Sequence, residues 1–258
     1  MRIGGALLFL IAVTSGWSQQ MRFAEPHMAS DSLVLTGGLP HNEYAFPVAR
    51  RDALMHYERF GIMSGQAYAK TPFRHWEMPV MVYIDKNVPN AVRRDFSKFI
   101  RQFKGIDNLK ILEVGQIEKA NYHVQVTDEI LSIDGQKDEL YQGTAYRMLE
   151  DNLGNCQSAV LLLNPKQVPD AEKQKHRLRQ FFYSSLCFFA FTGRAEKSSL
   201  LSKHYDGKPI LSDGDRSLLR THYALVNQNI VNPAIYDRLR ARFDALENPE
   251  GKTVKIRL

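Results

Sequence analysis

The chain has 258 residues, a formal net charge of +6 and 10% aromatic residues. This length suits one large domain or two small ones and is enough to bury a proper core. No internal repeat and no low-complexity segment occurs, which excludes a repeat array. The basic balance weakly favours anionic partners, although a solvated basic surface is the commoner explanation for it.

Residues 1–18 have the pattern of a secretory signal peptide. Arg2 gives a positive start, an uncharged run rich in Leu, Ile, Ala and Gly follows, and Gly16 and Ser18 fit the small-x-small rule for signal peptidase. Cleavage would leave Gln19 as the N-terminus. The apolar run is shorter than the about 20 residues of a spanning helix, so an uncleaved anchor is the weaker alternative. We therefore expect a periplasmic or secreted protein with no transmembrane span after cleavage.

Residues 19–72 are irregular in pattern and contain several Pro and Gly residues, with one helical stretch at about residues 50–60. We expect this segment to be an N-terminal extension that packs on a main domain at residues 73–258. Several aromatic side chains give the extension enough apolar surface to act as a cover: Tyr44, Phe46, Tyr57, Phe60 and Tyr68.

The main domain opens with a strand and an amphipathic helix. Residues 79–84, PVMVYI, have the Val, Ile and Tyr content of a buried strand. The next helix ends at Gly105, and its apolar face carries Val92, Phe96, Phe99, Ile100 and Phe103. Its other faces carry Arg93, Arg94, Lys98, Arg101 and Lys104. These cations indicate either an anion-binding strip or, more commonly, a solvated helix face.

Three further strands are predicted, at residues 109–114, 121–127 and 159–163. The second alternates apolar with polar residues, which is typical of an edge strand or of a strand that lines a site. The polar segment 133–154 suggests a hairpin or a long loop.

The C-terminal third is predicted to be helical. Asp170 could cap a long helix that continues through FFYSSLCFFAF to Gly193. A loop at residues 194–211 precedes a helix capped by Ser212, and a last helix starts at Asn232 and Pro233. The residues that we expect in the core of this region are Phe182, Leu186, Phe189, Leu218, Leu219, Tyr223, Ile235, Leu239 and Phe243.

Two segments carry a resemblance to a known family. The segment LSDGDRSLLRTHY, residues 211–223, is similar to a pattern of the type L-S-x-x-D-x-x-L-L-x-x-L-Y, and RHWEMPVMVYI places an Arg and a Trp before the first strand. Both resemble the bacterial exported family called domain of unknown function 2927, over roughly residues 73–240. The resemblance implies an α+β, zincin-like fold, with a small mixed sheet packed against a long apolar helix and C-terminal helices.

The chain departs from that family on the long helix. Family members carry an acidic motif of the type x-E-E-L-x-Q-x-L-G, and the matching positions here are Ser184, Ser185 and Leu186. Both carboxylates are absent. The resemblance therefore implies a pseudo-enzyme rather than a metallopeptidase.

The sequence contains no signature of metal or nucleophilic catalysis. A zincin needs two His one helical turn apart with a Glu beside the first, and no such pair occurs. A site built from distant residues remains a weaker alternative, with His176, His204 and His222 as its candidates. The nucleophile elbow G-x-S-x-G and the phosphate-binding loop are also absent. We therefore assign no catalytic residue and no cofactor.

Cys156 and Cys187 are the only cysteines. In an oxidising compartment they could form a disulfide, whereas Cys187 in an apolar helix could equally be a buried thiol. We expect an exported, non-catalytic domain that acts by binding or in an envelope assembly, with an envelope protein or an anionic ligand as partner and no nucleic acid. The alternative is a peptidase-like envelope hydrolase with a non-standard metal site.

Overall fold

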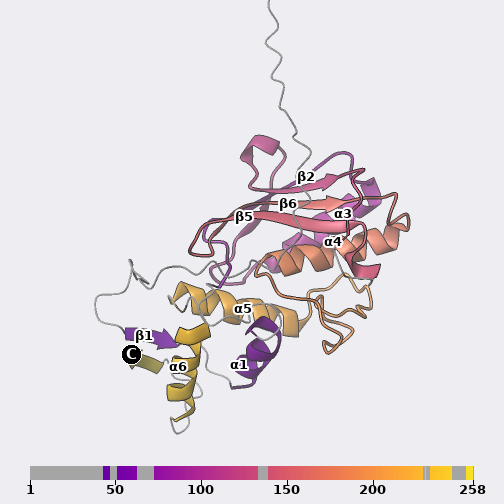
Figure 1. The fold of residues 1–258 in the computed structure, drawn as a ribbon. Helices are drawn as coiled ribbons and strands as arrows, with labels where there is room; N and C mark the ends of the chain where they lie inside the picture. Colours follow the sequence, from indigo (N-terminus) through magenta and orange to yellow (C-terminus); the bar gives the residue numbers. More distant parts are fainter. Residues whose placement is uncertain are drawn as a thin grey trace, which may run out of the picture.

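The computed structural model describes residues 43–46, 51–62, 73–132, 139–228, 230, 233–245 and 254–257. Within them the chain is an α+β protein in which a five-stranded sheet lies against layers of helices (Figure 1). The sheet has the strand order β3-β2-β4-β6-β5. Its strands are β2 (Val80–Ile84), β3 (Ile111–Glu113), β4 (Tyr122–Val126), β5 (Thr144–Glu150) and β6 (Cys156–Leu163).

Four of these strands are parallel, and β5 pairs with β6 in the antiparallel direction to form one edge of the sheet. The alternation of side chains along the strands fixes which face is buried. Val80, Val82 and Ile84 of β2 point into the core, and Tyr122 and Val124 of β4 continue that surface.

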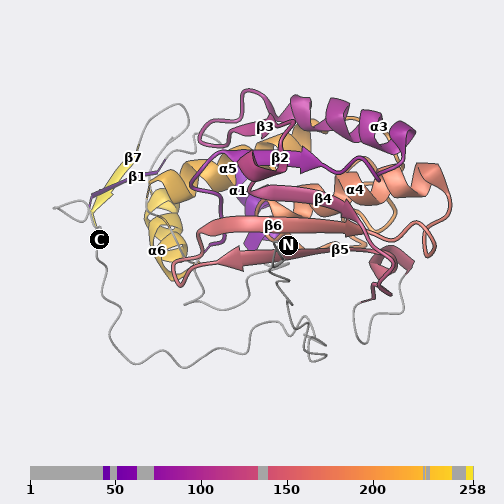
Figure 2. The same ribbon diagram turned by 90° about the horizontal axis from the view of Figure 1, so that it is seen from above.

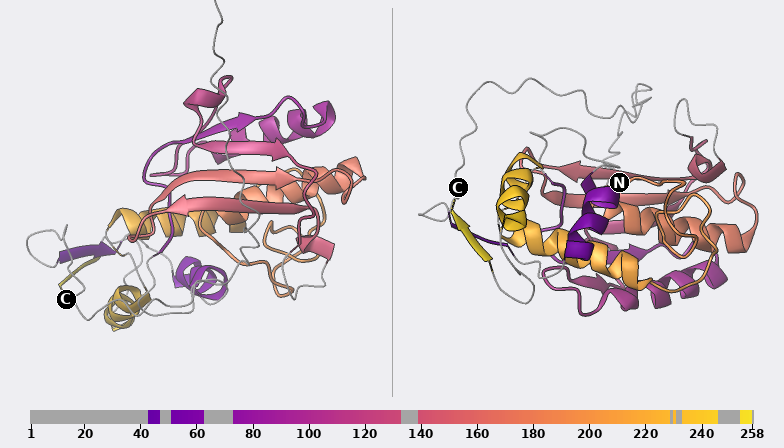
Figure 3. Two further views of the ribbon diagram at one scale, coloured as in Figure 1. Left: turned by 45° about the horizontal axis from the view of Figure 1, so that its top comes forward. Right: turned by 90° about the horizontal axis from the view of Figure 1, so that it is seen from below.

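Helices cover one face of the sheet in two layers (Figures 1 and 3). α3 (Asn90–Ile100) and α4 (Ala171–Ser185) lie directly against the strands. Beyond them lie α5 (Asp213–Asn227), α6 (Pro233–Asp244) and α1 (Arg51–Tyr57), which continues as a π-helical turn, Glu58–Ile62. Figure 2 looks onto the opposite face of the sheet, which none of the described α-helices covers.

The two ends of the described chain meet in a separate two-stranded sheet. β1 (Glu43–Phe46) pairs antiparallel with β7 (Val254–Arg257). No helix of the described residues has both the length and the apolar character needed to cross a membrane. Residues 1–18, which carry the predicted signal, lie outside the described residues, as does most of the segment 19–72.

The segment 133–154, expected to be a hairpin or a long loop, contains β5, which forms an antiparallel hairpin with β6. Two other sequence predictions need correction. β4 lies between β2 and β6, so it is a central strand, and its polar residues His123 and Gln125 point to the face without helices. The helix expected to reach Gly193 ends at Ser185.

The core contains all but one of the predicted residues whose side chains are described, the exception being Ile235. Phe182, Leu186, Leu219 and Leu239 are fully buried, and Phe189, Leu218 and Tyr223 are nearly so. Ile235 is only partly buried against this core, and the side chain of Phe243 lies outside the described residues.

Within the N-terminal extension, α1 and the turn that continues it belong to the same core. Leu54, Tyr57 and Phe60 are buried, and α1 packs on α5. The Tyr57 ring lies 6.4 Å from the Phe189 ring, so α1 covers the turn that follows α4.

Candidate functional site

The end of α4 is where a catalytic serine could have been exposed, and its two serine hydroxyls are buried instead. Ser184 Oγ donates to the Phe189 carbonyl at 2.7 Å, and Ser185 Oγ donates to the Phe182 carbonyl at 2.7 Å. Each serine oxygen is also within hydrogen-bond distance of a tyrosine hydroxyl: Tyr146 at 3.2 Å and Tyr122 at 2.8 Å. Because the serine protons go to carbonyls, the tyrosines are the donors in these pairs.

The electrostatics of this hydroxyl cluster also oppose nucleophilic chemistry. Burial raises the pKa of Tyr122 and raises the pKa of Tyr146 to about 12, against the smaller opposite effect of the serine hydrogen bonds. All four hydroxyls therefore stay protonated at neutral pH, and no base lies among them. Their hydrogen bonds tie the end of α4 to β4 and β5, which is a structural role.

The turn after α4 is built around Phe188, which has a positive φ of 57°. This backbone region normally takes Gly, so the surrounding contacts must hold a phenylalanine there. The Arg74 guanidinium lies 4.2 Å from the Phe188 ring centroid, and the Tyr146 ring meets its edge at 5.7 Å. Arg74 in turn pairs with Glu150 of β5 at 2.7 Å. The turn is thus clamped between the edge strand and the segment before β2.

The two cysteines are both buried thiols in the structure. Burial raises the pKa of the Cys156 thiol to about 12 and raises that of Cys187 well above its ordinary value. A thiol held in its neutral form is a poor nucleophile and a poor metal ligand. Neither cysteine therefore offers reactive chemistry in this state.

The three candidate histidines do not form a common site. Of the described residues, no group of three or more His, Cys, Asp or Glu side chains has the arrangement to hold a metal ion. His176 packs against the Tyr205 ring at 5.8 Å, and Gly207 leaves room for the imidazole because a Cβ there would lie 2.1 Å from its Cε1. His204 lies in the loop before α5, near Gly193.

His222 is completely buried and both of its ring nitrogens are used. Its Nε2 donates to the Arg74 carbonyl at 2.9 Å, and its Nδ1 accepts from the Tyr57 hydroxyl at 2.9 Å. Burial lowers the pKa of His222 to about 3, with the nearby His75 acting in the same direction. The ring is thus a neutral connector between α5, α1 and the segment before β2.

The start of the segment 211–223, from Ser212 to Asp215, also has a structural role. Ser212 Oγ accepts from the Asp215 amide at 3.1 Å and caps α5 as predicted. The buried Asp215 carboxylate accepts from Ser199 Oγ at 2.7 Å and from the Leu200 amide at 2.9 Å. Burial raises the pKa of Asp215. This aspartate fastens the loop 194–211 to the start of α5.

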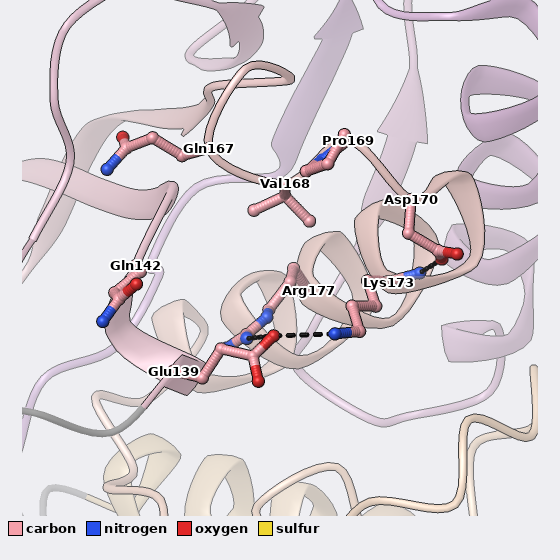
Figure 4. A pocket seen from close by; sticks show the side chains of 8 residues that line it. All are labelled: Glu139, Gln142, Gln167, Val168, Pro169, Asp170, Lys173 and Arg177. Carbon is pink, nitrogen blue, oxygen red and sulfur yellow. Dashed lines mark hydrogen bonds and ion pairs between the residues drawn. The ribbon is translucent and has the colours of Figure 1, made fainter.

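A small pocket of about 90 Å³ lies at the start of α4 (Figure 4). Lys173 and Arg177 project from the helix toward Glu139, at 2.8 Å and 4.0 Å, and Asp170 caps the helix by accepting from the Lys173 amide. The Glu139 and Asp170 carboxylates together balance the positive charges of Lys173 and Arg177. The pocket is therefore not an anion site comparable to an open helix N-terminus.

A scan against models of known protein families finds no match to this chain, and a search of curated proteins finds no relative. The site residues that sequence reasoning missed are Arg74, Tyr146 and Glu150, which clamp the turn at Phe188. The Arg before the first strand was noticed only as part of a resemblance. Tyr146 and Glu150 lie in β5, for which the sequence predicted only a hairpin or a long loop, so the alternation of side chains along this strand was the one signal that could have identified them.

Proposed function

We propose that this chain is an exported, non-catalytic domain with a zincin-like layout that acts by binding, as part of an envelope assembly in the periplasm or outside the cell. The order of elements supports this layout. Helix α4 follows β6, the last parallel strand. The antiparallel edge strand β5 lies beside the end of α4. Export is supported by the pattern of residues 1–18.

One observation carries the non-catalytic part of the proposal. The extended zincin motif is H-E-x-x-H-x-x-G-x-x-H, in which the helix ends in a turn at the Gly. Phe188, with its positive φ, occupies a turn of this kind at the end of α4. This register differs by three residues from the sequence comparison, which placed Ser184 and Ser185 at the acidic positions. Counting from Phe188, Phe181, Ser185 and Phe191 take the three His positions and Phe182 takes the Glu position.

Two of these positions lie together, and none of the four side chains is a ligand that zinc prefers. The Phe181 and Phe191 ring centroids are 5.1 Å apart, and Ser185 Oγ is held by the Phe182 carbonyl and Tyr122. Phe182, in the position of the general base, is fully buried among aromatic rings. Zinc requires imidazole, thiolate or carboxylate ligands, which this register does not supply.

Metal analysis of the purified mature protein tests this proposal most directly. We expect zinc well below one equivalent, together with no cleavage of a fluorescent casein substrate with or without added zinc. Stoichiometric zinc that survives dialysis would overturn the proposal and favour the alternative, a peptidase-like envelope hydrolase. A His176→Ala/His204→Ala double variant would then show whether these histidines hold the metal. The unchanged protein in the same buffer is the control.

The export part has its own test. N-terminal sequencing of protein from the cell envelope or medium should begin at Gln19, or within a residue or two of it. Recovery of the chain from the cytoplasm with Met1 intact would contradict export and would leave the non-catalytic proposal untouched.

A further inference from the structure

One surface of the molecule combines positive charges from two distant parts of the chain. On α3 and the turn after it, Arg94, Lys98, Arg101 and Lys104 are exposed and follow one another at helical spacing. α5 adds two arginines beside them. Arg216 donates to the Gln102 carbonyl at 2.8 Å, and Arg220 donates to the Gly105 carbonyl at 3.1 Å. We call these six residues the α3–α5 cationic surface.

Carboxylates offset only part of this charge: Asp107 in the turn after α3 and Asp213 at the start of α5 are both exposed. Asp95 is the sole carboxylate between Arg93 and Lys104, and both of its oxygens lie 3.2 Å from Arg179 Nη1 on the inner side of α3. Glu113 is the near neighbour on the outer side. It accepts from Ser97 at 2.5 Å and lies 3.9 Å from Arg101. The surface therefore retains a net positive charge over about three helical turns.

An exposed isoleucine lies against this surface and is held there by hydrogen bonds. The side-chain amide of Gln102 donates to the Pro209 carbonyl at 2.7 Å and accepts from the Leu211 amide at 2.8 Å. These two contacts hold the residues on either side of Ile210, whose own surface is 60% exposed. An aliphatic side chain fixed in water next to a row of cations has no evident use within the fold.

We propose that the α3–α5 cationic surface and Ile210 form a docking surface for an anionic lipid membrane. Exposed Lys and Arg side chains bind anionic headgroups through charge, and a neighbouring aliphatic side chain can enter the boundary with the acyl chains. Polysaccharides and nucleic acids match the charge but gain little from an isoleucine. The proposal does not depend on the absence of catalysis, since a zinc enzyme could dock in the same way.

Flotation of the mature protein with vesicles tests the proposal. We expect binding to phosphatidylcholine vesicles that contain phosphatidylglycerol, and much weaker binding to pure phosphatidylcholine. Neutralising Lys98, Arg101 and Lys104 together to Gln should weaken binding to the anionic vesicles about a hundredfold, since each cation near the surface contributes roughly fivefold. Raising the salt to about 0.5 M should have a similar effect, because it screens exposed charges.

A matched variant distinguishes the contribution of this surface to binding from the contribution of the protein's net charge. Lys119→Gln/Arg147→Gln/Lys166→Gln removes the same charge from exposed positions on other elements and should bind as well as the unchanged protein. Failure to bind anionic vesicles at low salt, or equal loss in the two triple variants, would overturn the proposal. Binding to polyglutamate but not to vesicles would also overturn it and would indicate an acidic protein partner.

The role of Ile210 is tested separately. Ile210→Ser should weaken binding to anionic vesicles about tenfold through the loss of buried hydrocarbon. Ile130→Ser is the control, because Ile130 is 83% exposed and lies in the loop after β4. Equal effects of the two serine variants would exclude insertion of Ile210, and the proposal as stated would fail.

Discussion

α3 and α4 lie side by side on the same face of the sheet, yet their sequences follow different rules. In α3 only one face is buried, through Val92, Phe96, Phe99 and Ile100. In α4 every residue from Arg177 to Ser185 is buried, including charged and polar ones. The difference follows from position in the layers, because α4 has the sheet on one side, α3 beside it and α5 beyond it (Figures 1 and 2).

The comparison teaches how far periodicity reveals burial. A helix with one free side must separate apolar from polar residues, so its pattern is clear in the sequence. A helix enclosed on all sides has no such requirement, and its polar residues are accepted when they are paired. Arg179 with Asp95 and Tyr183 with the Asp215 carbonyl are the examples in α4.

The largest expected effects are losses of unfolding free energy, and they should differ between neighbouring residues in the two helices. Phe182 packs between α3 and the sheet, whereas its neighbour Tyr183 donates to the Asp215 carbonyl on α5. Phe182→Ala and Tyr183→Ala should each lower the free energy of unfolding by about 3–5 kcal/mol. In α3 the corresponding neighbours should differ, with about 3–5 kcal/mol for Phe99→Ala and under about 0.5 kcal/mol for Lys98→Ala.

Chemical denaturation of the four variants measures these differences. A small loss of unfolding free energy in Tyr183→Ala would contradict the comparison, because α4 would then have a free side as α3 does. A large cost for Lys98→Ala would instead mean that the cationic side of α3 contributes to the fold.

The contact between the two helices gives the second prediction. Arg179 is 1% exposed and reaches Asp95 on α3 and the Gly207 carbonyl, at 2.7 Å, in the loop before α5. Asp95→Asn leaves that guanidinium without its countercharge and should cost about 2–3 kcal/mol. Lys173→Ala, which removes the exposed pair with Glu139, is the matched control and should cost at most about 1 kcal/mol. Equal costs, measured by urea denaturation, would mean that water reaches Arg179.

Much of the fold could be predicted because the apolar residues of most elements recur at the spacing of a strand or a helix. The strands β2, β4 and β6 and the amphipathic helix α3 were all found from apolar spacing, and Ser212 was found from its capping position. For β5 the sequence predicted only a hairpin or a long loop, because one of its faces is open to water and Arg147 and Leu149 obscure the inward alternation of Tyr146 and Met148.

Features that depend on contacts between distant residues could not be predicted. The end of α4 is set by Phe188 in a backbone region that no sequence rule assigns to phenylalanine. The hydrogen bonds of Gln102 that hold the residues on either side of Ile210 join positions more than a hundred residues apart. Nothing near Gln102 in the sequence distinguishes it from an ordinary surface glutamine.

The last prediction tests the layer that covers α4 on the side away from the sheet. His222 of α5 lies 5.4 Å from the Phe189 ring, and its folded pKa of about 3 is below the ordinary value of 6.5. As the pH falls below 6.5 the unfolded chain binds a proton at this position and the folded protein does not. The stability that His222 contributes is thus present above pH 6.5 and is lost as the pH falls toward 3. The contribution to the slope should approach about 1.4 kcal/mol per pH unit.

His222→Gln should therefore reduce the slope of unfolding free energy against pH between 6.5 and 5, where few carboxylates titrate, as well as lower stability at pH 7. Tyr57→Phe is the control, because it removes the hydrogen bond to Nδ1 and keeps the titrating ring. It should cost about 1 kcal/mol and leave the slope unchanged. Denaturation curves at several pH values measure both quantities. An unchanged slope in His222→Gln would mean that the ring takes up its proton in the folded state, and the layer beneath α4 would then be open to water rather than closed by α1 and α5.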